Sequence, residues 1–360
     1  MPDREIIARI AQEMGHPQPA VRRAASLLDE GNTVPFIARY RKEATGEMDE
    51  KMIRTLDERL TYLRGMQGRR EKILARIEEQ GKLTEELTEA ILQAETLQQL
   101  DDLYLPFRPK RRTRASVARE KGLEPLADRM LAQEDSEGDP LAIAGCLMPD
   151  GQEMEPAEAL SGARDIAVER VSEDSEVRGG LRRLMWSGGA ITVGKNEEGP
   201  SPYDIYFDFS GSVAALRPHQ VLAINRGERE GFLKVGISMP EESALGVLRK
   251  RFLRGASIWR EHVQSALVSA LKQRLQGAMA RECRRTLTER AEAHAIEVFD
   301  RNLTHLLMQA PIKGRVDMGI DPAFRTGCKV AVVDPAGRVL HTGAVFPQTP
   351  QRRLAESAQS

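Results

Sequence analysis

The sequence predicts a mainly α-helical fold with the beginning of an α/β domain at its C-terminal end. Two long stretches, residues 3–200 and Ala256–Ala310, repeat apolar residues at steps of three and four, which is the spacing of one helix face. Near the end the pattern changes, because Val316, Met318 and Ile320 alternate with other residues as in a strand. We therefore expect many helices, one of them long and central, followed by a pair of strands.

Local signals predict where the first helices begin and end. Gly31 is suited to end one helix, and Asn32 or Thr33 to begin the next, which predicts a helix-turn-helix joint. One long amphipathic helix should follow and end at Gly81. The apolar positions behind these two expectations are Val21, Ala24, Ala25 and Leu28, and then Ile53, Leu56, Leu60, Leu63, Ile73 and Ile77.

The second half of the chain is first irregular and then strongly helical. Between residues 188 and 240 we expect loops, one helix at about Pro218–Glu228 and a short strand at Phe232–Ile237. The long helix that follows should either pack against different neighbours along its length or break near Gly277, because a four-residue apolar repeat winds around an α-helix. That repeat runs through Val263, Leu267, Leu271, Leu275 and Met279 to Leu307.

The composition limits the classes of function. The 360 residues include 53 Lys and Arg against 54 Asp and Glu, for a formal net charge of −1, so a polyanion would have to bind at a local basic cluster. No apolar run reaches the roughly 20 residues needed to cross a membrane, and the N-terminus has no signal-peptide core, so we expect a cytoplasmic protein. The three cysteines, Cys146, Cys283 and Cys328, are widely spaced and predict reduced, buried thiols.

Residue spacings predict no cofactor. The six histidines show neither H-x-x-x-H nor H-E-x-x-H spacing, and no glycine-rich loop carries the Lys-Ser/Thr ending of a phosphate-binding loop. We therefore expect neither a metal-protease site nor a nucleotide pocket.

The densest basic cluster predicts a nucleic-acid contact. Its members are Arg108, Lys110, Arg111, Arg112, Arg114, Arg119 and Lys121, in a loop that leads into a helix. Seven cations so close together repel one another unless an anion faces them, and a phosphate backbone is a common such anion. Two alternatives stay open: ion pairs with acidic helix faces of the same chain, such as Glu85, Glu86 and Glu89, or a solvated surface.

A second basic group surrounds two aromatic residues. It consists of Arg249, Lys250, Arg251, Arg254 and Arg260. A phosphate track with a stacking residue is conceivable here, but the helical spacing of Phe252 and Trp259 favours a place in the core.

The C-terminal strands carry one candidate metal ligand. In GIDPAFRTGCKVAVVDPAGRVL, which begins at Gly319, a turn separates Asp321 from a second apolar run at Lys329–Val333. In ribonuclease-H-like enzymes an Asp of the first strand binds metal, but two-metal phosphodiester chemistry needs several carboxylates. We expect the strands that would supply them to be missing, so a metal-dependent nuclease is the alternative and not the main expectation.

Four ordered blocks of sequence resemble the bacterial Tex family of transcription accessory proteins. They are TVPFIARYRKEATGEMDE from Thr33, LYLPFRPKRRTRASVAREKGLEPLA from Leu103, DFSG and LAINRGERE up to Glu230, and GIDPAFRTGCKVAVVD from Gly319. The resemblance implies an elongated, mostly helical protein with a helix-turn-helix region, a long central helix and a ribonuclease-H-like YqgF domain. It also implies helix-hairpin-helix units, a C-terminal OB fold that binds RNA, and a role in transcription without a full catalytic set.

The chain departs from that pattern after Phe346, and Ala323 stands where the family has Gly. We therefore expect a truncated member with a helical domain at 1–200, a central helical region at 201–315 and the first YqgF hairpin at 316–360. The expected function is non-enzymatic, sequence-independent binding of RNA or DNA, with the transcription machinery as a further partner. A protein-interaction scaffold, in which the basic loop is paired internally, is the other alternative.

Overall fold

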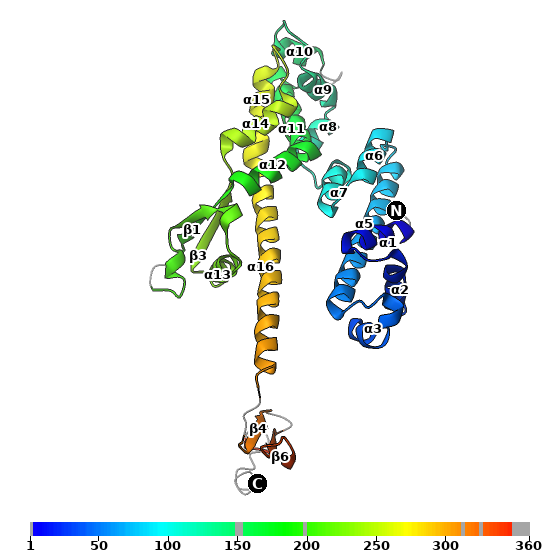
Figure 1. The fold of residues 1–360 in the computed structure, drawn as a ribbon. Coiled ribbons are helices and arrows are strands. Elements are labelled where there is room, and N and C mark those ends of the chain that lie inside the picture. The colour runs from blue at the N-terminus through cyan, green and yellow to red at the C-terminus, as the bar shows by residue number, and fades with distance from the viewer. Residues whose placement is uncertain (1–2, 148–153, 197–199, 311–313, 324–326, 348–360) are drawn as a thin grey trace. The chain divides into compact units, whose positions relative to one another are not determined.

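The computed structural model describes residues 3–147, 154–196, 200–310, 314–323 and 327–347. The chain forms two compact units, residues 1–291 and 292–360. The fold is mainly helical, as the sequence predicts, with two small sheets (Figure 1). No helix in the described ranges is both long enough and apolar enough to cross a membrane.

The first helices are α1 (Asp3–Met14), α2 (Gln18–Asp29), α3 (Val34–Tyr40), α4 (Lys42–Thr45) and α5 (Glu50–Glu79). Gly31 has a φ of +84° in the turn after α2, and the hydroxyl of Thr33 accepts a hydrogen bond from the N–H of Phe36. The predicted joint between two helices is confirmed, with Thr33 as its cap. Ile10, Val21, Ile37 and Ile53 are fully buried and form part of the core of this bundle.

The long helix α5 joins the first helices to a second small core. It buries its predicted stripe from Ile53 to Ile77 and ends just before Gly81, whose φ is +65°. Against its second half pack α6 (Glu85–Gln93), α7 (Leu97–Tyr104) and the 3-10 turn η1 (Leu105–Phe107). This segment leads directly into the predicted basic cluster, which begins at Arg108.

The largest core of the first unit is built around one central helix. Its helices are α8 (Arg114–Glu120), α9 (Glu124–Ala132), α10 (Pro140–Cys146), α11 (Pro156–Glu173), α12 (Ser175–Gly188), α14 (Glu241–Phe252), α15 (Arg260–Ala270) and α16 (Gln276–Leu307). Helix α11 contacts α8, α9, α10, α12 and α15, and the side chains of Ala163, Ile166 and Val171 are fully buried there. The stretch Ile166–Glu169 of α11 is buried, so the charge of Glu169 needs a partner inside the protein.

The long helix near the C-terminus contains a π-helical segment. This segment, η4 (Leu271–Leu275), joins α15 to α16 and lies just before Gly277, where a break was one of the two predicted outcomes. The apolar stripe is buried from Val263 through Met279 and continues to Ala291, whereas Leu307 is 73% exposed. A π-helical segment shifts the rotational position of the residues beyond it, so it changes which face of the helix meets the core.

A three-stranded sheet corrects the expectation for residues 188–240. It consists of β1 (Ala190–Lys195), β2 (Phe209–Ser212) and β3 (Leu233–Ser238) in the antiparallel order β2-β1-β3, with the 3-10 turns η2 (Asp204–Tyr206) and η3 (Val213–Ala215) between strands. The predicted helix, α13 (Pro218–Arg229), and the predicted strand β3 are confirmed. The expectation of helix or loop at β1 and β2 is wrong, and residue 200, the expected domain boundary, lies between two strands of this sheet.

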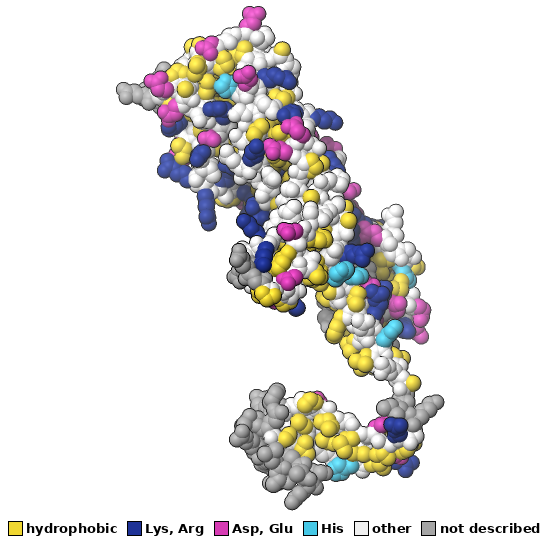
Figure 2. All heavy atoms as spheres, turned by 90° about the vertical axis from the view of Figure 1, so that its left-hand side faces the viewer, with side chains coloured by type: hydrophobic (Ala, Val, Ile, Leu, Met, Phe, Trp, Pro, Cys, Tyr) yellow, Lys and Arg dark blue, Asp and Glu magenta, His cyan; other side chains and the backbone are white. Residues whose placement is uncertain are grey.

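The strands of the second unit form an antiparallel sheet in the order β4-β5-β6. They are β4 (Asp317–Asp321), β5 (Cys328–Val333) and β6 (Val339–Val345). The predicted hairpin of β4 and β5 is confirmed, and β6 extends it by a third strand beyond the predicted pair. Large hydrophobic side chains of these strands remain exposed, as the yellow atoms in the lower part of Figure 2 show.

Candidate nucleic-acid interface

The basic loop is the segment between η1 and α8 together with α8 itself. A capping box fixes the start of α8. In it the hydroxyl of Thr113 accepts a hydrogen bond from the N–H of Ser116, and the hydroxyl of Ser116 accepts one from the N–H of Thr113. This local structure requires only short polar side chains at the start of α8. It sets the direction in which the flanking arginines leave the backbone.

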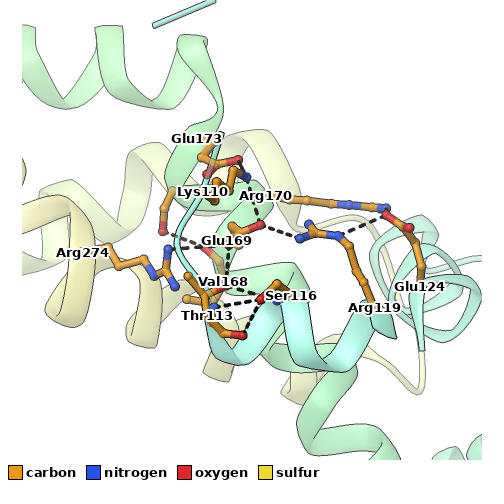
Figure 3. A network of polar contacts seen from close by, with 11 residues as sticks. Lys110, Thr113, Ser116, Arg119, Glu124, Val168, Glu169, Arg170, Glu173 and Arg274 are labelled. Atoms are coloured by element: carbon orange, nitrogen blue, oxygen red, sulfur yellow. Dashed lines mark hydrogen bonds and ion pairs between the residues drawn. The ribbon is translucent and has the colours of Figure 1, made fainter. Parts of the chain in front are cut away.

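One buried carboxylate holds this segment at three residues (Figure 3). The side chain of Glu169, on α11, has no exposed surface. Its oxygens accept hydrogen bonds from Lys110 Nζ at 3.0 Å, Arg119 Nη1 at 2.6 Å and Thr113 Oγ1 at 3.3 Å. Lys110 also pairs with Glu173 at 2.7 Å. The beginning of the loop and the last turn of α8 are therefore tied to the central helix.

The balance of burial and charge keeps Glu169 ionised. Burial alone would raise its pKa, but the hydrogen bonds from Arg119 and Lys110 outweigh this effect and hold the pKa below the ordinary value. The neighbouring Glu173 has its pKa raised, because burial there outweighs the contact with Lys110. Lys110 and Arg119 thus serve as counter-ions of a buried acid, and releasing either would leave part of its charge unpaired.

Three arginines of the loop are exposed, and only one of them pairs with an acidic side chain. Arg111 and Arg114 are exposed and form no hydrogen bond or ion pair with any described residue. Arg112 pairs only with Glu120 at 3.1 Å, and both side chains are largely solvated, so this pair contributes little. These outward arginines, Arg111, Arg112 and Arg114, can contact a phosphate without breaking a buried interaction.

The remaining cations of the predicted cluster have acidic partners at its two ends. Arg108 pairs with Asp101 at 3.0 Å and lies 5.7 Å from the ring centre of Tyr104. Lys121 pairs with Glu158 at 2.7 Å. Both pairs are partly exposed, so both cations remain accessible to solvent.

The second basic group is mostly engaged within the protein. Arg249 pairs with Glu242, Arg251 pairs with Asp174 and Glu176, and Arg254 and Arg260 donate to backbone carbonyls. Lys250 is exposed and has no hydrogen bond or ion pair among the described residues. Trp259 is fully buried and donates from its ring nitrogen to Asp135 at 2.7 Å, so the expectation that it belongs to the core is confirmed.

Comparison with protein families identifies the chain. Its residues 4–78 match the Tex-like protein N-terminal domain, residues 135–299 match the Tex central region-like family, and residues 315–360 match the Tex protein YqgF-like domain. The chain belongs to the Tex family. The resemblance carried by the four sequence blocks is thereby confirmed.

Named relatives align with nearly the whole Tex chain. Protein tex of Bordetella pertussis is 42% identical, over 96% of this chain and 46% of its own length. The transcriptional accessory protein Tex of Neisseria gonorrhoeae is 38% identical, over 96% of this chain and 46% of its own length. The human S1 RNA-binding domain-containing protein 1 is 31% identical, over 89% of this chain and 34% of its own length. The chain spans about half the length of these bacterial relatives.

The acids that pair with the basic loop of this Tex chain are not those expected from the sequence. Glu85, Glu86 and Glu89 form no ion pair with the cluster among the described residues, whereas Glu169 and Glu173 do. One feature of the sequence indicates that Glu169 is buried. Glu169 follows Ile166, Ala167 and Val168 directly and precedes Val171, so it lies in an apolar helix segment.

The other candidate site residues of the chain are dispersed. Cys283 is buried, and burial raises its pKa to about 11, but Cys146 is exposed, so the expectation of three buried thiols is wrong. Asp321 is exposed at the end of β4. Within the described part of the chain, no three His, Cys, Asp or Glu side chains gather as a metal site would require.

Proposed function

We propose that this Tex chain is a non-enzymatic, sequence-independent nucleic-acid-binding part of a transcription accessory protein. The outward arginines Arg111, Arg112 and Arg114 are its main phosphate contacts. The observation that carries this proposal is the division of the basic loop: Glu169 fixes Lys110 and Arg119, while three neighbouring guanidinium groups remain in solvent. A fixed loop presents its charges with little loss of conformational entropy on binding.

The named relatives and the surface charge agree with this proposal. One relative is named for transcription and another for an RNA-binding domain. Basic and acidic side chains are interspersed over the face in Figure 2, so a local cluster and not a general field would attract the polyanion. Binding should therefore be weak and should depend steeply on salt, without preference for sequence.

The experiment measures affinity for a fluorescent single-stranded RNA and a DNA duplex over a range of salt concentrations. Each lost phosphate contact should reduce the slope of log affinity against log salt by about 0.7 on a single strand and about 0.9 on a duplex. Arg111→Ala, Arg112→Ala and Arg114→Ala together should therefore flatten the slope by roughly 2 to 3. Arg22→Ala with Arg23→Ala, two exposed arginines of α2, is the matched control and should leave the slope unchanged. An equal slope in the triple variant would remove the loop from the interface.

The absence of catalysis is tested separately. Incubation of the chain with RNA and DNA in the presence of Mg²⁺ or Mn²⁺ should give no cleavage, because Asp321 does not share its site with further carboxylates in the described residues. Metal-dependent cleavage that disappears in Asp321→Asn would replace this proposal by the nuclease alternative.

A further inference from the structure

A large open groove lies in the first unit, and no residue of the basic loop lines it. Its volume is about 1450 Å³. One wall comes from α6, α7 and the turn between them, and the other from α12, α14 and the first half of α16. Apolar groups line it, including Leu97, Leu103, Val177, Trp186 and Val247. The groove is larger than the 300 to 1,000 Å³ of a typical small-molecule site, so its size suits a segment of a macromolecule.

A network of ion pairs holds the two walls together. Asp102 of α7 accepts from Arg178 and Arg182 of α12, each at 2.7 Å, and Arg182 also pairs with Glu282 of α16. Asp102 is 3% exposed, so these contacts are largely shielded from solvent. The groove is therefore preformed, which lowers the cost of binding a partner.

The charged side chains of the groove that have no ion-pair partner among the described residues are positive. Its acidic side chains, Asp102, Glu176 and Glu282, are all paired with arginines. Arg183 and Lys250 have no hydrogen bond or ion pair among the described residues. A partner that brings carboxylates to these two positions would form interactions that the chain itself leaves unmade.

We propose that this groove binds an amphipathic, acidic α-helix of a partner protein. The apolar lining would take the hydrophobic face of the helix, and Arg183 and Lys250 would meet its Glu and Asp side chains. A helix of three turns has about 11 residues and is about 16 Å long. This length is enough for apolar anchors at positions i, i+3, i+4 and i+7.

The aromatic rings favour this occupant over a nucleic-acid strand. The guanidinium of Arg290 lies 4.5 Å from the centre of the Trp186 ring, and that of Arg59 lies 5.3 Å from the centre of the Tyr62 ring. Both rings of the groove therefore already have a cation on one face. Single-strand binding relies on open aromatic faces for base stacking, whereas an apolar helix face needs only hydrophobic contact.

Trp186 provides a direct readout for the test. The chain has two tryptophans, and Trp259 is fully buried in the core, so a ligand-dependent change in emission reports on Trp186. The probe is a 14-residue helical peptide with Leu at the anchor positions and Glu on the opposite face. Its matched peptides carry Lys in place of Glu, or the same residues in an order without helical periodicity. The Glu peptide should change the emission saturably, and the two matched peptides should bind at least tenfold more weakly.

Charge reversal identifies the site. Arg183→Glu with Lys250→Glu should weaken binding of the Glu peptide at least tenfold, whereas Arg22→Glu with Arg23→Glu on α2 should not change it. The variant without the outward arginines should bind the peptide as the wild type does, because this proposal does not depend on the proposed function. Equal binding of the Lys peptide, or unchanged affinity after reversal at Arg183 and Lys250, would overturn the inference. Displacement of the Glu peptide by an oligonucleotide that itself changes Trp186 emission would assign the groove to nucleic acid instead.

Discussion

Replacing Glu169 by Gln should destabilise the core of the first unit and loosen the basic loop. The substitution keeps the shape of a side chain with no exposed surface, but it removes the charge that Lys110 and Arg119 neutralise. Breaking a buried ion pair by removing one partner costs about 3 to 5 kcal/mol. Lys110 keeps Glu173 and Arg119 keeps Glu124, so we expect the lower end, about 3 kcal/mol.

Thermal unfolding followed by circular dichroism measures this loss. At about 2 to 4 °C per kcal/mol for a domain of this size, the melting temperature should fall by roughly 6 to 12 °C at pH 7. The control is Glu120→Gln, which removes the exposed partner of Arg112 and should cost less than about 1 kcal/mol. A Glu169→Gln protein as stable as the wild type, to within about 1 kcal/mol, would refute the anchoring role.

The same substitution has a defined pH dependence. The folded-state pKa of Glu169 is lowered, so the stability it provides is fully present above its unfolded pKa of about 4.5 and is lost as pH falls through the folded pKa. The difference in melting temperature between wild type and Glu169→Gln should therefore be constant from pH 7 to 5 and shrink at lower pH. A difference that grows as the solution is acidified would contradict the lowered pKa.

Two further predictions test the core. In Gly189→Ala the new Cβ would overlap the carbonyl oxygen of Met185, so urea unfolding should show a loss of about 3 kcal/mol. Gly188→Ala, whose Cβ meets nothing closer than 3.7 Å, should be close to wild type, and equal losses in both would contradict the steric argument. With a thiol reagent at pH 8, exposed Cys146 should react rapidly. Buried Cys283, with its pKa raised to about 11, should react only on unfolding. If the folded Cys146→Ser variant is labelled rapidly at Cys283, the core opens without global unfolding and the prediction is wrong.

The helices could be predicted from the sequence because their determinants are local. Gly31, Thr33 and Gly81 act through the backbone of their own turn, and the apolar stripe of α5 needs only a periodic pattern. The partners of each helix did not have to be known. The same reasoning holds for α13, whose position follows from Pro218 at its first turn.

The strands β1 and β2 could not be predicted in the same way because their pairing is not local. Ile191 and Val193 are the buried positions of β1, and this alternation is too short to separate from a loop. What makes the segment a strand is its pairing with β3, where Ile191 faces Ile237 and Val193 faces Val235 across more than forty residues of chain. A short strand whose partner is distant carries little signal of its own.

The basic loop shows why a charge count alone overstates a nucleic-acid site. If all seven cations contacted phosphates of a single strand, the salt slope attributable to them would be about 5. Lys110 and Arg119 are committed to Glu169, because their release would leave a buried carboxylate with weaker compensation. If only the outward arginines contacted phosphates, the slope would be about 2 on the same strand. A measured contribution near 5 from this segment would therefore require the buried network to open on binding. Glu169→Gln, which weakens that network, would then strengthen binding.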